Sequence, residues 1–387
     1  MKNNMRNKVF ITSVLLAAAL MTSCHEKEPI EDNSAREEAF GKIAEAFLDN
    51  TVYPTYAALA DNTEALLASI EDLAADKTQA KLNAVCTRFL DARAQWELSE
   101  AFLFGAATDF GIDPHIDSWP LDEDSFNDLM ASPNILKNLQ GEGGAEYAGA
   151  KLGNELLGFH GIEYILFEDG KSKDVSKISD DAMIYAIAVA GDLRNRTAQL
   201  DVAWRGNKAP AARTEMMEDL ELQVTVSGGD SSYGENLLNA GKAGSTFYSR
   251  THAMQSILSA CSNIIDEVGT SKIGKAHNGE DVSYIESPYS YNSITDFYDN
   301  ITSVENVYYG GVAGKRDESK SLHAYLKENN PEIDRAVTAA LGEALAKIKA
   351  MKAPFVLNYT DKSAKEAIQA CAELDECIGK AITAIAQ

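Results

Sequence analysis

Apolar residues recur every three or four positions along nearly the whole chain from about Ser34 onward. This spacing places apolar side chains on one face of an α-helix, where they can pack against a neighbouring helix. No stretch of any length alternates between apolar and polar residues, which would be the pattern of a half-buried β-strand. The sequence therefore predicts an all-α fold, most simply two packed helical bundles.

The expected helices fall into two groups around a hydrophilic break, Arg205-Gly206-Asn207-Lys208-Ala209-Pro210. We expect an N-terminal bundle over residues 34–205 and a C-terminal bundle over residues 206–387. Each half contains a long helix, an irregular loop and a shorter helix, which leaves an ancient duplication open. The longest helices are expected near residues 78–105, 151–167, 179–204, 243–268, 331–351 and 361–385.

The N-terminus has the parts of a bacterial lipoprotein signal. Basic residues precede an apolar run over residues 9–21, and Leu20-Met21-Thr22-Ser23-Cys24 resembles a lipoprotein cleavage box. The apolar run is too short for a comfortable transmembrane helix. We expect residues 1–23 to be a signal peptide and Cys24 to carry the lipid. Residues 24–33 then form a flexible charged tether to the membrane. The protein is expected to be an exported lipoprotein of the cell envelope, in the periplasm or on the cell surface.

The charge of the chain excludes one class of partner. There are 35 Lys and Arg residues against 59 Asp and Glu, a formal net charge of -24. The phosphate backbone of a nucleic acid would be repelled, so no nucleic-acid partner is expected.

The cysteines after Cys24 are Cys86, Cys261, Cys371 and Cys377. An even number permits disulfides in an oxidising compartment, and sequence cannot assign partners. Cys371 and Cys377 lie on different sides of one expected helix, so they should not pair with each other. Most of the four are better interpreted as small buried hydrophobic residues.

The segment Gly158-Phe159-His160-Gly161-Ile162-Glu163 carries the strongest candidate ligands. His160 and Glu163 are three residues apart, which on a helix places the imidazole and the carboxylate on one face. Glycine inside a helix costs on the order of 1 kcal/mol relative to alanine, so the two glycines suggest a close approach to this face. A metal site between packed helices is one interpretation, and a hydrogen-bonded core pair is the other. The zincin signature requires a second histidine one helical turn after the first. No histidine stands at that distance from His160, so this signature is absent.

Glu97 and Glu100 form a second pair with the same spacing, for which a solvated helix face is the alternative. Glu-x-x-Glu and His-x-x-Glu together offer four ligands from two facing helices, as in the metal sites of helical bundles. Asp117, in the loop between these helices, can add an oxygen ligand, with Asp113 and His115 as alternatives. Mixed carboxylate and imidazole ligation suits iron, zinc or manganese, and the hard oxygens favour iron.

These segments resemble the imelysin-like proteins, a family grouped by descent with a metallopeptidase. Gly158 to Glu163 is similar to the family's Gly-x-His-x-x-Glu motif. Three further segments also resemble the family: Trp96 to Gly105, Asp117-Ser118-Trp119-Pro120 and Glu286-Ser287-Pro288-Tyr289-Ser290. The resemblance implies an all-helical, two-domain exported protein, commonly a lipoprotein, linked to iron acquisition in bacteria. By similarity to related iron-uptake proteins, it implies the metal ligands Glu97, Glu100, Asp117, His160 and Glu163.

We therefore expect a non-catalytic lipoprotein that binds a divalent or ferric ion, with iron favoured over zinc. It would take part in iron or haem-iron uptake, together with other uptake components of the envelope. The main alternative is a metallopeptidase in which a metal-bound water attacks the peptide carbonyl, with Glu163 or Glu100 as general base. A second alternative is a polymer- or peptide-binding protein in which the motif is structural.

Overall fold

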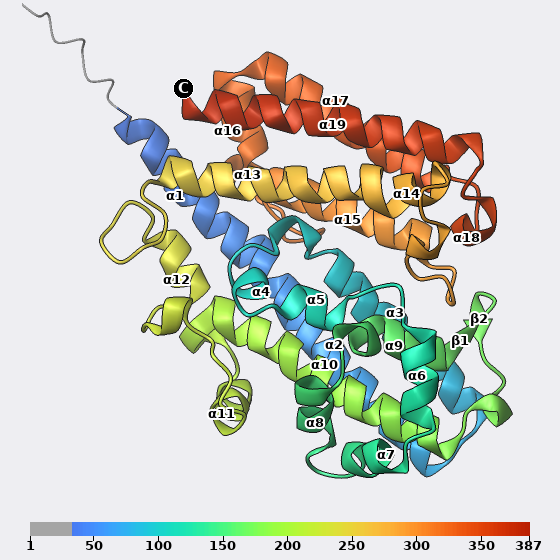
Figure 1. Ribbon diagram of the computed structural model, residues 1–387. Helices are drawn as coiled ribbons and strands as arrows, with labels where there is room; N and C mark the ends of the chain where they lie inside the picture. The colour runs from blue at the N-terminus through green and yellow to red at the C-terminus, as the bar shows by residue number, and fades with distance from the viewer. Residues whose placement is uncertain (1–32) are drawn as a thin grey trace, which may run out of the picture.

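The computed structural model describes residues 33–387, and helices dominate this part of the chain (Figure 1). The all-α prediction is confirmed. The expected signal peptide, Cys24 and the tether as far as residue 32 lie outside the described residues. Among the helices that are described, none is both long enough and apolar enough to cross a bilayer.

The first half is built on three long helices. α1 (Ser34–Phe47) continues through a π-helical turn (Leu48–Val52) into α2 (Tyr53–Ala75), which packs against α3 (Gln79–Glu97) and α10 (Asp180–Arg205). Short elements fill the sequence between α3 and α10. They are α4 (Ala106–Asp109), α5 (Ile112–Ile116), α6 (Glu123–Met130), α7 (Pro133–Leu139), α8 (Gly144–Lys151), α9 (Gly158–Leu166), β1 (Phe167–Glu168) and β2 (Lys171–Ser172). The two strands form one small antiparallel hairpin, which the periodicity does not predict.

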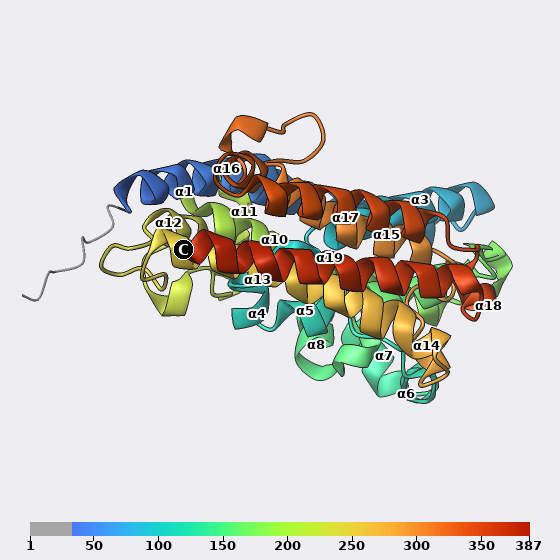
Figure 2. The same ribbon diagram turned by 90° about the horizontal axis from the view of Figure 1, so that it is seen from above.

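The second half contains another set of long helices, which lies above the first in the view of Figure 1. α13 and α17 both pack against α19, and α15 packs against α17; Figure 2 shows this layer from above. The helices are α11 (Ala211–Asp219), α12 (Tyr233–Leu238), α13 (Arg250–Asp266), α14 (Gly274–His277), α15 (Ser293–Tyr308), α16 (Leu322–Asn329), α17 (Pro331–Lys349), α18 (Phe355–Asn358) and α19 (Lys362–Ala386). A π-helical turn (Glu267–Ile273) joins α13 to α14.

One continuous hydrophobic core joins the two sets of helices, from Phe40 in α1 to Ile385 in α19. α11 and α12 pack against α10, beside the first set (Figure 1). α3 contacts α15, and the 3₁₀ turn after α3 contacts α13. The faces of α3 and α15 thus meet in the interior, and polar residues placed there are removed from water. The proposed boundary at 205/206 and the duplication stay predictions.

Two expected helices are shorter than predicted. α3 ends at Glu97, and Glu100 lies in a separate 3₁₀ turn (Glu100–Phe102). Glu97 and Glu100 therefore do not share one helix face. The helix expected over 151–167 begins only at Gly158, whose φ of 65° belongs to a turn and not to a continuing helix.

The four described cysteines are all free. Cys86, Cys261 and Cys371 are buried and Cys377 is partly buried, as expected of small hydrophobic residues.

Candidate functional site

A cluster of charged side chains lies in the interior where the two sets of helices meet. None of its members is more than 3% exposed, although charged side chains are rarely buried without a partner. We call it the buried cluster. Its members are Arg93, Glu97, Asp117, His160, Glu163, Lys272, Glu286 and Asp296.

Two glycines bring α9 into this cluster. A Cβ atom on Gly158 would lie 1.8 Å from the carbonyl oxygen of Ile116, so only glycine lets α9 approach the end of α5. A Cβ atom on Gly161 would lie 2.2 Å from the Tyr185 hydroxyl of α10. The close approach expected at this face is therefore present. It places His160 of α9 next to Asp117, the residue that follows α5.

The imidazole of His160 is held through one nitrogen only. Its Nδ1 lies 3.3 Å from Glu163 Oε2. Glu163 is fixed in turn, because its Oε1 accepts hydrogen bonds from the Ser290 amide at 2.8 Å and the Ser290 hydroxyl at 2.6 Å. His160 Nε2 lies 3.1 Å from Asp117 Oδ1, but it is buried and makes no aligned hydrogen bond. The fold thus orients Nε2 toward a carboxylate oxygen without satisfying it.

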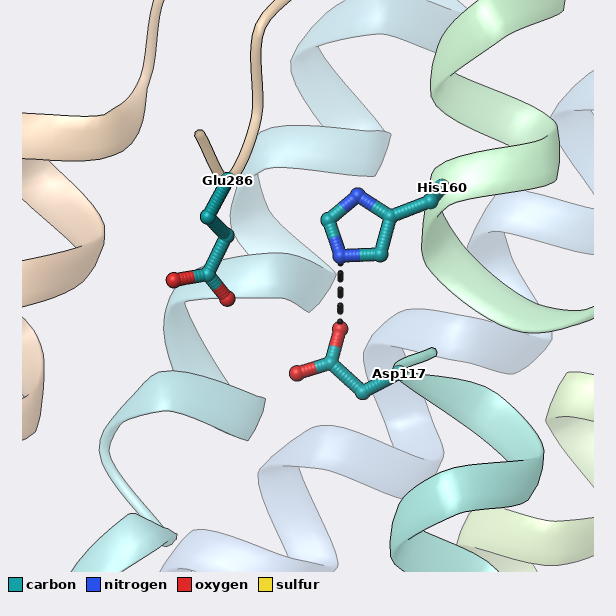
Figure 3. Close-up of side chains that lie close together, drawn as sticks. All are labelled: Asp117, His160 and Glu286. Atoms are coloured by element: carbon teal, nitrogen blue, oxygen red, sulfur yellow. Dashed lines mark ion pairs between the residues drawn. The ribbon is translucent and has the colours of Figure 1, made fainter. Parts of the chain in front are cut away.

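Asp117 and Glu286 complete a group of potential ligands around this nitrogen (Figure 3). One ligand atom from each of Asp117, His160 and Glu286 lies within 4.8 Å of the other two. The indole of Trp96 donates to Asp117 Oδ2 at 2.7 Å, which fixes the carboxylate from behind. Lys272 Nζ lies 3.0 Å from both carboxylate oxygens of Glu286. We call Asp117, His160 and Glu286 the inner group.

Arg93 of α3 is the central cation of the cluster. Its guanidinium donates to Asp117, and to Glu286 Oε1 at 2.5 Å. It also pairs with Glu97 Oε1 at 2.5 Å, one turn along α3. The other oxygen of Glu97 accepts from the Asn300 amide of α15 at 2.5 Å. Glu97 therefore belongs to the buried cluster but reaches the inner group only through Arg93.

The remaining sequence candidates lie elsewhere. Glu100 and Asp113 line a separate pocket, together with Asp117. His115 Nε2 is 2.7 Å from Asp192 of α10, outside the buried cluster. The structure thus brings Glu97, Asp117, His160 and Glu163 together in the buried cluster, and it places Glu100 outside this cluster, in the pocket beside Asp117.

Glu286 is a member of the inner group that sequence reasoning did not select as a ligand. In the sequence it is only the first residue of Glu286-Ser287-Pro288-Tyr289-Ser290, one of the segments that resemble the imelysin-like proteins. Arg93 and Lys272 were also not selected. The spacing of four between Arg93 and Glu97 is a visible signal of an ion pair on α3, whereas Lys272 carries no comparable signal.

The buried cluster holds more negative than positive groups. Five carboxylates, those of Glu97, Asp117, Glu163, Glu286 and Asp296, face two permanent cations, Arg93 and Lys272, and the ionisable imidazole of His160. Such a surplus is costly in a low-dielectric interior unless protons or a bound cation neutralise it.

The pKa values follow from this balance. Burial raises the pKa of Glu97 well above its usual value, against the opposing effect of Arg93. Burial also raises the pKa of Asp296 to about 6. Burial by itself would lower the pKa of His160. The Asp117 and Glu163 carboxylates outweigh this effect and raise the pKa of His160 to about 9. Burial would raise the pKa of Asp117, but Arg93 and His160 hold it well below its usual range.

Two pockets reach the buried cluster, and Trp119 lines both of them. The first, of about 460 Å³, reaches His160 and has mostly apolar walls that include Leu121, Ile285 and Pro288. The second, of about 200 Å³, reaches Asp117 and is acidic. One pocket thus borders His160 and the other borders Asp117, two members of the inner group.

Comparisons with known proteins agree with this architecture. A family model described as Imelysin matches residues 52–380. Iron-regulated protein A of Synechococcus elongatus is 24% identical over 356 residues, which cover 91% of this chain and 85% of that protein. A crystal structure described as an iron-regulated protein A precursor from Parabacteroides distasonis has a TM-score of 0.76 and 26% identity. The structural match covers 90% of this chain and 95% of the Parabacteroides chain. An imelysin-like protein from Psychrobacter arcticum shares the fold at 16% identity, with a TM-score of 0.60 and coverage of 88% and 93% of the two chains. The family model spans most of the described residues, as the Gly-x-His-x-x-Glu resemblance predicts, and the chain belongs to the imelysin family.

Proposed function

We propose that this protein binds a metal ion through Asp117, His160 and Glu286, and that it serves iron acquisition without catalysing a reaction. The observation that carries the proposal is the buried His160 Nε2, which lacks an aligned hydrogen bond inside a group of ligand atoms within 4.8 Å. A bound cation would satisfy this nitrogen and neutralise part of the surplus negative charge. The donor set therefore fits a metal ion.

Glu163 has a positioning role in this proposal. Metal-binding histidines commonly donate their second ring N–H to a carboxylate, which fixes the tautomer and the ring orientation. The contact of Glu163 with Nδ1 supplies this partner and leaves Nε2 for the ion. Trp96 does the same for Asp117 by holding Oδ2.

Arg93 sets a condition on binding, because it donates to both carboxylates of the inner group. A carboxylate has about four lone-pair sites on its two oxygens, so it can serve the guanidinium and an ion together. Two carboxylates and one imidazole suit iron, zinc or manganese, and the oxygen ligands favour iron.

The iron context comes from the relatives. The Synechococcus relative bears the name iron-regulated protein A. The predicted lipoprotein signal, with lipidation at Cys24, would hold the protein in the cell envelope, where it could meet other iron-uptake components. The relative's name, the predicted membrane anchor and the inner group together support a role in iron or haem-iron uptake.

The contacts of the carboxylates favour the non-catalytic form over a metallopeptidase. A general base needs a carboxylate free to take a proton from water or substrate. Glu163 is engaged by His160 and Ser290, and Glu286 by Lys272 and Arg93. Glu100, the other candidate base, lines the second pocket and does not belong to the inner group.

Elemental analysis and metal titration of the full chain test the proposal. We expect the inner group to bind one equivalent of iron or zinc, and this equivalent to be lost in His160→Ala, Asp117→Asn and Glu286→Gln. Glu64→Gln, at an exposed position on α2, is the matched control and should keep the metal. Absence of metal under every loading condition would leave the motif a structural pair and overturn the proposal. Peptide cleavage by the loaded protein, absent in His160→Ala, would favour the metallopeptidase instead.

A further inference from the structure

The acidic pocket beside Asp117 is not used by the proposed function. It lies between the 3₁₀ turn after α3, the α5 segment and the π-helical turn that follows α13. Its volume is about 200 Å³. It is lined by Glu100, Asp113, Pro114, Asp117, Ser118, Trp119, Glu267, Lys272 and Tyr284.

Glu100 is the informative residue of this pocket. Its side chain is only 7% exposed and lines the pocket, yet within the described part of the chain it makes no hydrogen bond and no ion pair. Asp113 and Glu267 are partly buried in the same wall and also have no side-chain partner among the described residues. A buried carboxylate without a partner is costly, so a ligand that neutralises it would be favoured.

The cations near this pocket are already engaged. Lys272 is held by both oxygens of Glu286 at 3.0 Å, and Asp117 is paired with Arg93. Lys272 also lies in the pocket wall, and its charge acts on Glu100, Asp113 and Glu267. Its ion pair is with Glu286, so three carboxylates share one cation that is already paired. The pocket is an acidic recess next to the inner group, and it has no nitrogen or sulfur ligand of its own.

We propose that Glu100, Asp113 and Glu267 form a second cation site, which binds a hydrated, hard di- or trivalent metal ion. Carboxylate oxygens are the ligands that such ions prefer, whereas the inner group adds an imidazole that suits transition metals. Among the described residues only the inner group brings three ligand atoms within 4.8 Å, so an ion in the acidic pocket keeps water in its shell. A volume of about 200 Å³ accommodates an ion with several waters of about 30 Å³ each. This second site does not depend on metal binding at His160.

Terbium luminescence tests the second site on the full chain. Tb³⁺ is a hard, oxygen-preferring probe, and Trp119 and Tyr284 in the pocket wall can sensitise its emission. We expect saturable sensitised emission with one strong site. Glu100→Gln and Glu267→Gln should each weaken Tb³⁺ binding by about tenfold or more, because ligand charge sets the affinity of such sites. Two variants are needed because Glu100 is buried and Glu267 is only partly buried.

Control variants separate this site from the acidic surface and from the inner group. The double variant Glu64→Gln, Glu71→Gln removes two exposed carboxylates of α2 and should leave Tb³⁺ affinity unchanged. His160→Ala should also retain Tb³⁺ binding, whether or not it loses iron or zinc. Displacement of Tb³⁺ by Ca²⁺, Mg²⁺ or Mn²⁺ would support the proposal. Equal Tb³⁺ affinity in the parent, Glu100→Gln and Glu267→Gln would overturn it, as would the absence of saturable emission.

Discussion

His160 Nε2 lies 3.1 Å from Asp117 Oδ1 without forming an aligned hydrogen bond. Each of the two side chains is held from behind, His160 by Glu163 and Asp117 by Trp96. The surrounding fold therefore holds both facing atoms in place, in addition to the ion pair that they form when His160 is protonated. This is the arrangement expected of preorganised ligands, and the following predictions depend on it.

Glu163→Gln should weaken metal binding without removing any atom of the inner group. The new amide oxygen can accept from Ser290, which turns the amide NH₂ toward His160 Nδ1. Nδ1 must then accept a hydrogen bond, and the ring proton moves to Nε2, where it blocks the ion. We expect a loss in metal affinity of about 10- to 100-fold, as for other partners of metal-bound histidines. Nitrogen NMR of the imidazole above about pH 9, where the ring is neutral, would report the tautomer directly. Unchanged metal affinity would contradict the positioning role.

Metal affinity should fall as the pH is lowered. Because the pKa of His160 is raised to about 9, its ring carries a second proton at neutral pH, and the ion must displace it. Each pH unit below this pKa should therefore cost about tenfold in affinity. Titration calorimetry in buffers of different ionisation enthalpy should show about one proton released per ion bound. Affinity that does not change between neutral and mildly acidic pH would rule out His160 as the ligand.

Arg93→Met should destabilise the metal-free protein strongly. The change leaves the carboxylates of Asp117, Glu97 and Glu286 without their central cation. Breaking a buried ion pair in this way costs about 3–5 kcal/mol in the free energy of unfolding. Added metal should stabilise this variant more than the parent, because a cation replaces part of the lost charge.

Urea denaturation with and without metal measures both effects of Arg93→Met. Arg88→Met on the same helix is the matched control, since Arg88 and its partner Asp91 are about half exposed and should contribute little. A similar small effect of both substitutions would show that Arg93 does not balance the buried cluster.

Asp299→Asn should stabilise the protein at alkaline pH and not at acidic pH. Burial, followed by the charge of Asp296, raises the pKa of Asp299 to about 7 from 3.8. The folded state therefore disfavours the ionised form. This cost is absent below about pH 4, grows as the pH rises, and is complete above about pH 7. At pH 8 we expect the variant to gain about 1–3 kcal/mol in the free energy of unfolding. Denaturant curves at both ends of this range check the sign, and an equal gain at both would contradict it.

The fold was predictable because helical periodicity is a local property of the sequence. The long helices near residues 179–204, 331–351 and 361–385 were expected and are found as α10, α17 and α19. Helix ends depend on less local causes. The expected continuation from Glu97 to Glu100 is broken where the chain turns into a 3₁₀ segment before Gly105, whose φ is 78°. Because of this turn, the Glu100 side chain lies in the acidic pocket and does not share a helix face with Glu97.

The composition of the site was predictable only in part, for the same reason. His160 and Glu163 are neighbours on one helical turn, so their spacing is visible in the sequence. Arg93 and Glu286 are 193 positions apart and meet only because α3 and the segment before α15 pack together. No pattern within either segment indicates that contact. A single sequence thus identifies the histidine and its orienting carboxylate but not the cation that balances the cluster.

Gly161→Ala tests the packing that presents His160 to Asp117. The added Cβ atom would lie 2.2 Å from the Tyr185 hydroxyl, which donates to the Leu156 carbonyl at 2.7 Å. Overpacking of this kind costs about 1–3 kcal/mol in the free energy of unfolding. Tyr185→Phe removes the obstructing oxygen at a cost of about 1–3 kcal/mol, because it leaves the Leu156 carbonyl without its donor.

The double variant Gly161→Ala, Tyr185→Phe should therefore be less destabilised than the sum of the two single changes, which urea denaturation of all four proteins measures. Gly342→Ala on α17 is the matched control, since a Cβ atom there meets nothing within 4 Å. It should stabilise the protein by about 0.5–1 kcal/mol, the usual gain of alanine over glycine in a helix. Strict additivity of the two changes at residues 161 and 185 would show that the Tyr185 hydroxyl is not what requires glycine next to His160.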